Sequence, residues 1–201
     1  TIMLQAAAHV PARALTVTPA LSSDMLPVWS PDGRTLAFAR FDASSRCQIM
    51  LVAASGGNER KIADCFAGMA STYDWTPDGS GLLMGLEAKL ANERSSPLRK
   101  LDIASGKWSS LVYVIADGDI DIDPRYSPDG KWIVFRRSIS LSDLWKMPAE
   151  GGAPQRLTHV KSDIRGWDWL PDGSGIIYSY VGSDVGMFHL DLASGAATYL
   201  K

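Results

Sequence analysis

The acidic residues of this 201-residue chain give the first indication of where chemistry could occur. Aspartates alternate with other residues over positions 117–123, as they do at the start of a calcium-binding loop. Counted from Asp117, however, the sixth position is Ile122 and the twelfth is Pro128, where an EF-hand needs glycine and glutamate. An EF-hand is therefore excluded. We expect a solvated loop in which Asp121 and Asp123 are candidate contacts for a partner.

A second set of charges stands directly before a repeated aromatic residue. This position holds Asp74, Arg125 and Asp168 in three places and Val28 in the fourth. A strand that is only scaffold would keep the position apolar, so the charges predict a contact surface or a lined channel. Ion pairs among the charges themselves are the alternative, and the sequence leaves both open.

Motifs of the common enzyme classes are missing from the sequence. It contains no Gly-x-Ser-x-Gly elbow, no phosphate-binding loop and no His-Glu-x-x-His pair. None of the three histidines (His9, His159 and His189) has an acid and a nucleophile beside it, and two cysteines with three scattered histidines make a poor metal site. We therefore predict no catalytic residue, no metal and no cofactor.

The two cysteines, Cys47 and Cys65, are placed symmetrically about Gly56, where a hairpin is expected to turn. Residues at equal distances from a hairpin turn face each other across the strands, so a disulfide between them is one prediction. Two unrelated free thiols are the alternative. A bridge would indicate an oxidising compartment.

A repeated turn indicates which elements position these residues. Proline presets the backbone for a type I turn, aspartate suits the next position, and glycine takes the left-handed conformation that follows. The aspartates are therefore expected to serve the turns. The four copies lie with their glycines 46, 51 and 43 residues apart, at Pro31-Asp32-Gly33, Pro77-Asp78-Gly79, Pro128-Asp129-Gly130 and Pro171-Asp172-Gly173.

Each copy is followed by a short apolar run and, 21 to 27 residues after its glycine, by a second glycine-containing turn. Two hairpins in series make four antiparallel strands, the content of one propeller blade. The predicted fold is therefore an all-β propeller of four-stranded blades. We assign an outer hairpin of a partial blade to residues 1–20 and full blades to residues 21–65, 66–116, 117–161 and 162–201. Four and a half blades suggest part of a larger ring, whose open edges could self-associate. A self-closing four-bladed ring and a swapped dimer are the alternatives.

Composition restricts the classes of partner. The net charge is −2, and no basic cluster is longer than the two residues of Arg136-Arg137, so nucleic-acid binding by this segment is not expected. No apolar run approaches the roughly 20 residues of a membrane span, so any anchor is expected outside these residues.

The repeats resemble a known family. The pattern Asp-x-x-Pro-x-aromatic-Ser-Pro-Asp-Gly at 24–33 and 121–130, with Arg-Leu-Thr at 156–158, is similar to the WD-like propeller repeat of the TolB family. This resemblance implies a non-enzymatic propeller in the bacterial envelope, periplasmic or otherwise extracytoplasmic, that binds a protein or small ligand at one face. We favour the sensory region of a membrane-anchored transcriptional regulator. A TolB-type interaction module and the gating propeller of a prolyl-oligopeptidase-like serine peptidase are the alternatives.

Overall fold

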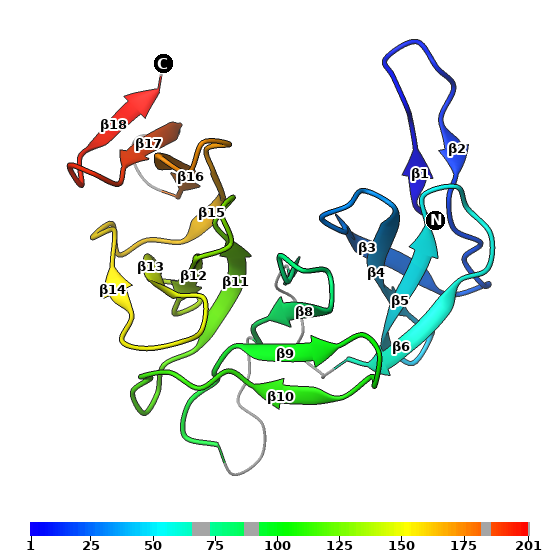
Figure 1. Cartoon of the computed structure of the whole chain (residues 1–201), viewed down its shortest axis with the longest axis horizontal. Helices are drawn as coiled ribbons and strands as arrows, with labels where there is room; N and C mark the ends of the chain where they lie inside the picture. Colours follow the sequence, from blue (N-terminus) through cyan, green and yellow to red (C-terminus); the bar gives the residue numbers. More distant parts are fainter. Residues whose placement is uncertain (66–72, 87–92, 182–185, 201) are drawn as a thin grey trace. The chain divides into compact units, whose positions relative to one another are not determined.

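The computed structural model describes residues 1–65, 73–86, 93–181 and 186–200. Within these ranges all regular structure is β-strand, and no helix suited to crossing a membrane occurs in them. Four sheets contain four strands each, and a fifth contains the strands β1 and β2 (Figure 1). The predicted all-β propeller of four-stranded antiparallel blades is confirmed, whereas membership of a larger ring remains a prediction.

The strands of each blade follow one another in the chain and pair with their sequence neighbours. The small N-terminal sheet pairs β1 (Met3–Leu4) with β2 (Arg13–Ala14). Blades 1 and 2 comprise β3 (Ser23–Trp29), β4 (Thr35–Phe41), β5 (Cys47–Ala53), β6 (Arg60–Asp64), β7 (Tyr73–Trp75), β8 (Gly81–Met84), β9 (Arg99–Asp102) and β10 (Trp108–Ser110). Blades 3 and 4 comprise β11 (Asp121–Tyr126), β12 (Trp132–Arg137), β13 (Asp143–Pro148), β14 (Gln155–Arg156), β15 (Ile164–Trp169), β16 (Gly175–Tyr180), β17 (Met187–Asp191) and β18 (Ala197–Leu200).

The repeated Pro-Asp-Gly turns join the first two strands of every blade. Their four glycines have φ between 68° and 72°, a left-handed conformation in which a side chain is disfavoured. In blade 1 the Asp32 carboxylate accepts hydrogen bonds from the Ser30 hydroxyl at 2.6 Å and the Arg34 amide at 3.0 Å. Because the other three aspartates bond to their own turns in the same way, this set belongs to the scaffold.

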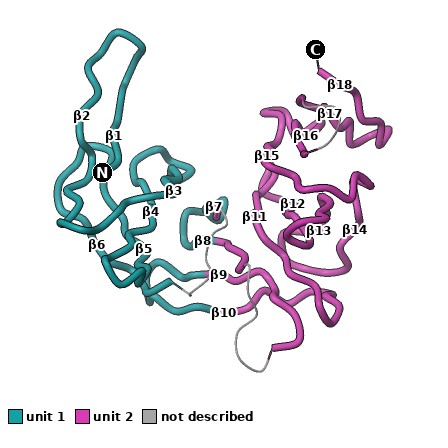
Figure 2. The backbone as a smooth tube through the Cα atoms, turned by 180° about the vertical axis from the view of Figure 1, so that it is seen from behind, with its two compact units in different colours: residues 1–69, 75–82, 101–108 teal, residues 70–74, 83–100, 109–201 magenta. Residues whose placement is uncertain are grey.

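The chain divides into two compact units, shown in Figure 2, and the division runs through blade 2. Unit 1 holds residues 1–69, 75–82 and 101–108, and unit 2 holds residues 70–74, 83–100 and 109–201. In unit 1, Leu15 of the N-terminal hairpin packs with Phe38 and Met50 of blade 1. In unit 2, blades 3 and 4 share a core that includes Val134 and Ile176. Each unit thus has apolar packing of its own.

A recurring contact, which we call the hydroxyl joint, involves the segment that ends a blade. A hydroxyl there accepts a hydrogen bond from a backbone amide at or directly before the start of the third strand, and it donates one to a buried carboxylate. In the N-terminal hairpin, Thr16 Oγ1 accepts from the Ile2 amide (2.9 Å) and donates to Asp24 Oδ2 of β3 (2.7 Å). In blade 2, Tyr113 Oη accepts from the Leu98 amide (3.0 Å) and donates to Asp121 Oδ2 of β11 (2.6 Å).

Blade 3 carries a variant of the hydroxyl joint. Thr158 Oγ1 accepts from the Leu144 amide and donates to Asp143, each at 2.9 Å, so the carboxylate comes from the same blade. The corresponding position at the start of blade 4, opposite Tyr180 in the register, is the apolar Ile164. The first two joints therefore connect neighbouring segments, whereas the third closes within one blade.

Tryptophan side chains also connect successive blades. Trp75 Nε1 donates to the Val28 carbonyl at 3.0 Å, and Trp169 Nε1 donates to the Arg125 carbonyl at 3.5 Å. Trp75 is 5% exposed, whereas the corresponding Trp29 of blade 1 is 41% exposed. The repeated aromatic residue is thus buried in blade 2, where it reaches the preceding blade.

The cysteines of β5 and the segment after β6 lie opposite each other. The Cys65 amide donates to the Cys47 carbonyl at 2.9 Å, and the two Cα atoms are 4.9 Å apart. The structure joins the two sulfur atoms in a disulfide that connects the third strand of blade 1 to the end of its fourth.

Candidate binding cleft between blades 3 and 4

Two of the five residues singled out in the sequence serve the scaffold. The side chain of Asp121 is fully buried, accepts from Tyr113, and pairs with Arg137 Nε at 2.7 Å. The expectation that this residue lies in a solvated loop is therefore not met, because β11 begins at Asp121 and carries it inward. Asp74 Oδ2 accepts a hydrogen bond from the Tyr126 amide at 2.9 Å, which connects β7 to β11.

The two equivalent carboxylates of the hydroxyl joints differ in their acidity. Burial by itself would raise the pKa of Asp24, but hydrogen bonds from Arg40, Thr18 and Thr16 and the charge of Arg40 lower it to about 2. Burial raises the pKa of Asp121, against the opposing effects of Arg137 and Tyr113. Asp119, which lies 3.0 Å from Arg137, adds a like charge that raises the pKa of Asp121 further.

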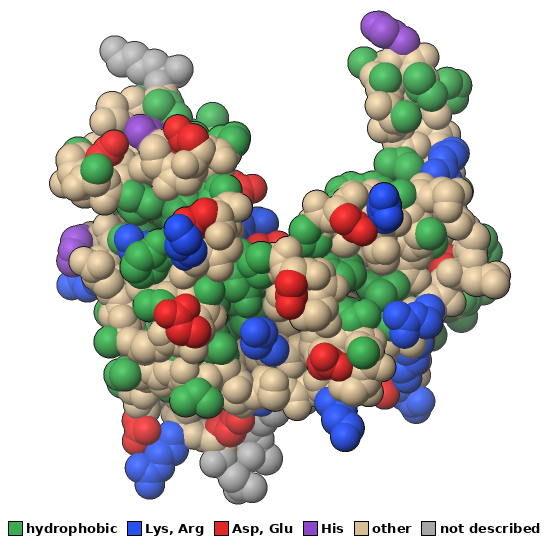
Figure 3. Space-filling view, in the orientation of Figure 1, with side chains coloured by type: hydrophobic (Ala, Val, Ile, Leu, Met, Phe, Trp, Pro, Cys, Tyr) green, Lys and Arg blue, Asp and Glu red, His purple; other side chains and the backbone are tan. Residues whose placement is uncertain are grey.

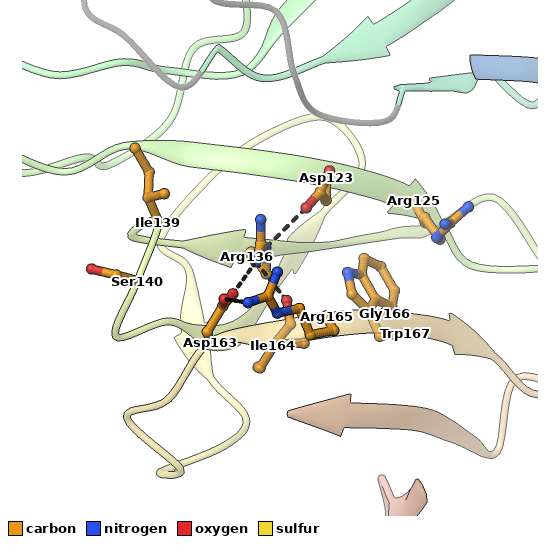
Figure 4. A pocket seen from close by; sticks show the side chains of 10 residues that line it. All are labelled: Asp123, Arg125, Arg136, Ile139, Ser140, Asp163, Ile164, Arg165, Gly166 and Trp167. Atoms are coloured by element: carbon orange, nitrogen blue, oxygen red, sulfur yellow. Dashed lines mark hydrogen bonds and ion pairs between the residues drawn. The ribbon is translucent and has the colours of Figure 1, made fainter. Parts of the chain in front are cut away.

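The other three residues meet in or beside one cleft of about 380 Å³ in unit 2 (Figure 4). The cleft lies between the first strands of blades 3 and 4, β11 and β15, with Arg136 of β12 and the loop after it on a further side. Asp123 and Arg125 line it, and Asp168 pairs with Arg125 from its margin. The full lining comprises Asp123, Arg125, Arg136, Ile139, Ser140, Asp163, Ile164, Arg165, Gly166 and Trp167.

A β-bulge places the acidic wall of the cleft. The register of β11 on β12 shifts between Ile122 and Arg125, and Asp123 within the bulge has φ 51°. A left-handed aspartate directly before Pro124 is sterically unfavourable, so the surrounding structure must hold it in place. Bulges redirect side chains at binding sites. Here the bulge brings Asp123 Oδ2 to 2.9 Å from Arg136 Nε.

Arg136 is fixed as the floor of the cleft. It pairs with Asp123 and with Asp163 Oδ1 (3.3 Å), donates to the Ile164 carbonyl (2.5 Å), and its side chain is 11% exposed. Arg165, on the other side, pairs with Asp163 Oδ2 at 2.9 Å and is 69% exposed. Two of the three arginines therefore have close carboxylate partners.

Arg125 is held much more loosely. Its guanidinium lies 5.5 Å from the ring centroid of Trp167, and its nearest carboxylate in the described part of the chain is the 71% exposed Asp168, at 3.9 Å. The buried nitrogens Arg125 Nε and Trp167 Nε1 have no hydrogen-bond acceptor among the described residues. A buried donor without an acceptor destabilises a protein by about 1–3 kcal/mol, so such a pair calls for an explanation.

The sequence did not indicate four residues of this cleft, namely Arg136, Asp163, Arg165 and Trp167. Trp167 occupies the strand position that holds proline in blades 1 and 3, so a comparison of the repeats could have drawn attention to it. The ion pair of Arg136 with Asp163 depends on how blade 4 packs on blade 3, which no local pattern reveals.

Two further cavities, of about 390 and 370 Å³, lie beside the Pro-Asp-Gly turns of blades 3 and 4 and of blades 1 and 2. Their linings share most positions of the repeat, with Trp169 in one cavity and the corresponding Trp75 in the other. Because the same space recurs wherever two such turns meet, it is a product of the repeat. The arginine-lined cleft is better suited to a specific ligand.

Other charged groups are dispersed. On the face shown in Figure 3, basic and acidic side chains are interspersed, without an extended patch of one sign. No cluster of three or more histidine, cysteine or acidic side chains suited to a metal ion occurs in the parts of the chain described above.

Comparison with known proteins agrees with this architecture. The chain is 30% identical over 146 residues to the uncharacterized peptidase YuxL of Bacillus subtilis, a match that covers 58% of this chain and 22% of that protein. It is 26% identical over 162 residues to the uncharacterized protein Atu1656 of Agrobacterium fabrum, with 78% and 50% covered. The chain thus spans half or less of the length of these relatives.

Among solved structures, TolB from Acinetobacter baumannii superposes with a TM-score of 0.69 at 22% identity, covering 89% of this chain and 43% of that one. At this identity the likeness supports the fold alone. The family model described as the TolB beta propeller domain matches residues 8–201. The chain therefore belongs to the TolB β-propeller domain family.

Proposed function

We propose that this chain is a non-catalytic binding propeller and that the cleft between blades 3 and 4 is its binding site. The supporting observation is the pair of buried donors, Arg125 Nε and Trp167 Nε1, that lack an acceptor within the described residues. Concave sites with a few convergent polar groups are typical of ligand binding. Asp123 contributes by positioning Arg136.

Two observations bear on the setting of this propeller. The 30% identity to YuxL, named a peptidase, favours the propeller of a larger peptidase, of which this segment would be a non-catalytic part. The disulfide of Cys47 and Cys65 supports an extracytoplasmic location, because disulfides persist in oxidising compartments. A TolB-type interaction module fits that location as well.

The sensory role in a transcriptional regulator rests on the sequence alone, since none of the relatives mentioned above carries the name of a regulator. Reading the parent gene on both sides of these residues separates the settings. A serine hydrolase domain downstream would favour the peptidase, and a winged helix upstream would favour the regulator.

The binding role is tested with a displayed library of random peptides, selected on the purified chain and measured by fluorescence anisotropy. We expect selected peptides to lose at least about tenfold in affinity with Arg125→Ala, which removes a charge-assisted hydrogen bond. The exposed Arg46→Ala is the charge-matched control and should bind as the wild type does. Peptides that bind Arg125→Ala unchanged, or cleavage of the peptides by the purified chain, would contradict the proposal.

A further inference from the structure

The charge balance of the cleft indicates what kind of ligand it would accept. Its lining carries three guanidinium groups and two carboxylates, a net charge of +1. The two carboxylates, Asp123 and Asp163, are already engaged by Arg136 and Arg165. The remaining positive charge is that of Arg125, so a ligand with one negative charge would neutralise the cleft.

The unsatisfied groups specify the ligand further. Arg125 Nε and Trp167 Nε1 are both donors, so they require a ligand that offers acceptors. Figure 4 shows the two side chains on the same side of the cleft, with the indole nitrogen on the edge of the ring turned toward Arg165. Trp167 is 7% exposed, and its indole nitrogen is a buried donor without an acceptor among the described residues.

Resting on the proposed function, we propose that the cleft binds a carboxylate group, through Arg125 and the indole N–H of Trp167. The guanidinium carbon lies 5.5 Å from the ring centroid. One carboxylate can bridge groups at this separation, because each of its oxygens accepts a hydrogen bond at about 2.9 Å. A planar carboxylate also suits the planar fork of arginine, whereas a dianionic phosphate would leave an excess negative charge.

In the free protein, Asp168 at the margin of the cleft is the carboxylate partner of Arg125. Its carboxylate is 3.9 Å from Arg125 Nε and 71% exposed, which is too long and too solvated for a strong pair. Arg125 is 29% exposed, so its guanidinium can turn toward a carboxylate that enters the cleft beside the Trp167 ring. Asp168 therefore competes with the ligand for Arg125.

The test follows the indole N–H signal of Trp167 by ¹H–¹⁵N NMR, identified among the seven tryptophans with Trp167→Phe. The probes are N-acetylglycine, which mimics a peptide terminus, an N-acetylglutamate amide with a free side-chain carboxylate, N-acetylglycine amide, and inorganic phosphate, all at constant ionic strength. We expect a saturable shift with one or both carboxylates and none with the neutral amide. The tighter of the two carboxylate probes identifies the source of the group.

Two variants should move the affinity in opposite directions. Arg125→Ala should weaken carboxylate binding about tenfold or more, whereas Asp168→Asn should strengthen it about two- to fivefold by removing the competing charge. The Asp168→Asn measurement stands alone if Arg125→Ala fails to fold. A shift with phosphate only, no shift at all, or weaker binding by Asp168→Asn would overturn the inference.

The outcomes separate this inference from the function on which it rests. If selected peptides bind at Arg125 but retain their affinity after their carboxylates are removed by amidation, the binding function stands and the carboxylate inference fails. If no peptide binds at the cleft, the proposed function itself is wrong.

Discussion

The substitution Asp24→Asn tests whether the hydroxyl joint contributes to stability. Asp24 is a fully buried carboxylate that accepts from Thr16 (2.7 Å), from Thr18 (2.6 Å) and from two nitrogens of Arg40 (2.6 and 2.9 Å). Asparagine has the shape of aspartate but no charge. Its amide N–H groups would face the hydroxyl and guanidinium groups that donate hydrogen bonds to the carboxylate. It therefore disturbs the N-terminal hairpin and blade 1 together.

Two estimates of the magnitude agree. Removing one partner of a buried ion pair destabilises a protein by about 3–5 kcal/mol. Arg40 keeps Glu59 at 2.6 Å, so the lower end of that range applies. Independently, a pKa lowered from 3.8 to about 2 corresponds to roughly 2 kcal/mol of favourable interaction with the charged form. We expect a loss of about 2–3 kcal/mol in the free energy of unfolding.

The assay is thermal and urea denaturation followed by circular dichroism at pH 7. For a protein of this size, such a loss lowers Tm by about 4–12 °C. Asp64→Asn is the matched control, because that carboxylate is 75% exposed and forms a surface ion pair with Lys61. The substitution should change stability by less than about 1 kcal/mol. A Thr16→Val variant, alone and combined with Asp24→Asn, should show coupling of about 0.5–3 kcal/mol. If Asp24→Asn has the same Tm and free energy of unfolding as the Asp64→Asn control, the hydroxyl joint does not contribute to stability and the reasoning is wrong.

Three further predictions concern acid stability, the disulfide and the tryptophans. Because the pKa of Asp24 in the folded protein lies below 3.8, its contribution to stability is present above about pH 4 and is lost as the pH falls through about 2. Asp24→Asn should therefore reduce the loss of stability in acid, measured as the free energy of unfolding against pH. An unchanged acid limb of this curve would contradict a stabilising role of the Asp24 charge. Non-reduced peptide mapping should find Cys47 linked to Cys65, and Cys47→Ser should lower stability by about 3 kcal/mol for a separation of 18 residues, whereas two freely alkylated thiols would contradict the bridge. Trp75→Phe loses the 3.0 Å hydrogen bond to the Val28 carbonyl and should destabilise the protein by about 1 kcal/mol. The control Trp29→Phe, at a 41% exposed site, should have almost no effect on stability. Equal melting temperatures of the two variants would contradict a stabilising role of the Trp75 hydrogen bond.

The sequence predicts the blades well because their signals are local. A turn of proline, aspartate and glycine must form a tight hairpin wherever it stands, and Gly33, Gly79, Gly130 and Gly173 all take the left-handed conformation. The opposition of Cys47 and Cys65 follows from the same reasoning, because hairpin pairing is set by distance from the turn.

The cleft was less accessible to sequence analysis because its residues are assembled across two blades. Asp121 looks like part of an exposed acidic run, yet the strand carries it inward to Arg137, and no pattern of alternating aspartates distinguishes these outcomes. Arg125 stood out because its charge breaks an apolar position. Its neighbour Trp167 did not, since an aromatic residue in a strand is an ordinary component of a core.

The hydroxyl joint has a consequence for how such an array can change in evolution. Blade 1 and blade 3 each begin with a buried acid, Asp24 and Asp121, and the segments before them supply the hydroxyl, from Thr16 in one case and Tyr113 in the other. The acid and the hydroxyl that form this contact are of the same chemical kind at both boundaries. A blade that is duplicated, lost or exchanged between genes would therefore still find a matching hydrogen-bond partner in its new neighbour. Blade 4, which has Ile164 in place of the acid, lacks this interchangeability. Recombination at the boundary before blade 4 would be tolerated less readily than at the boundaries before blades 1 and 3.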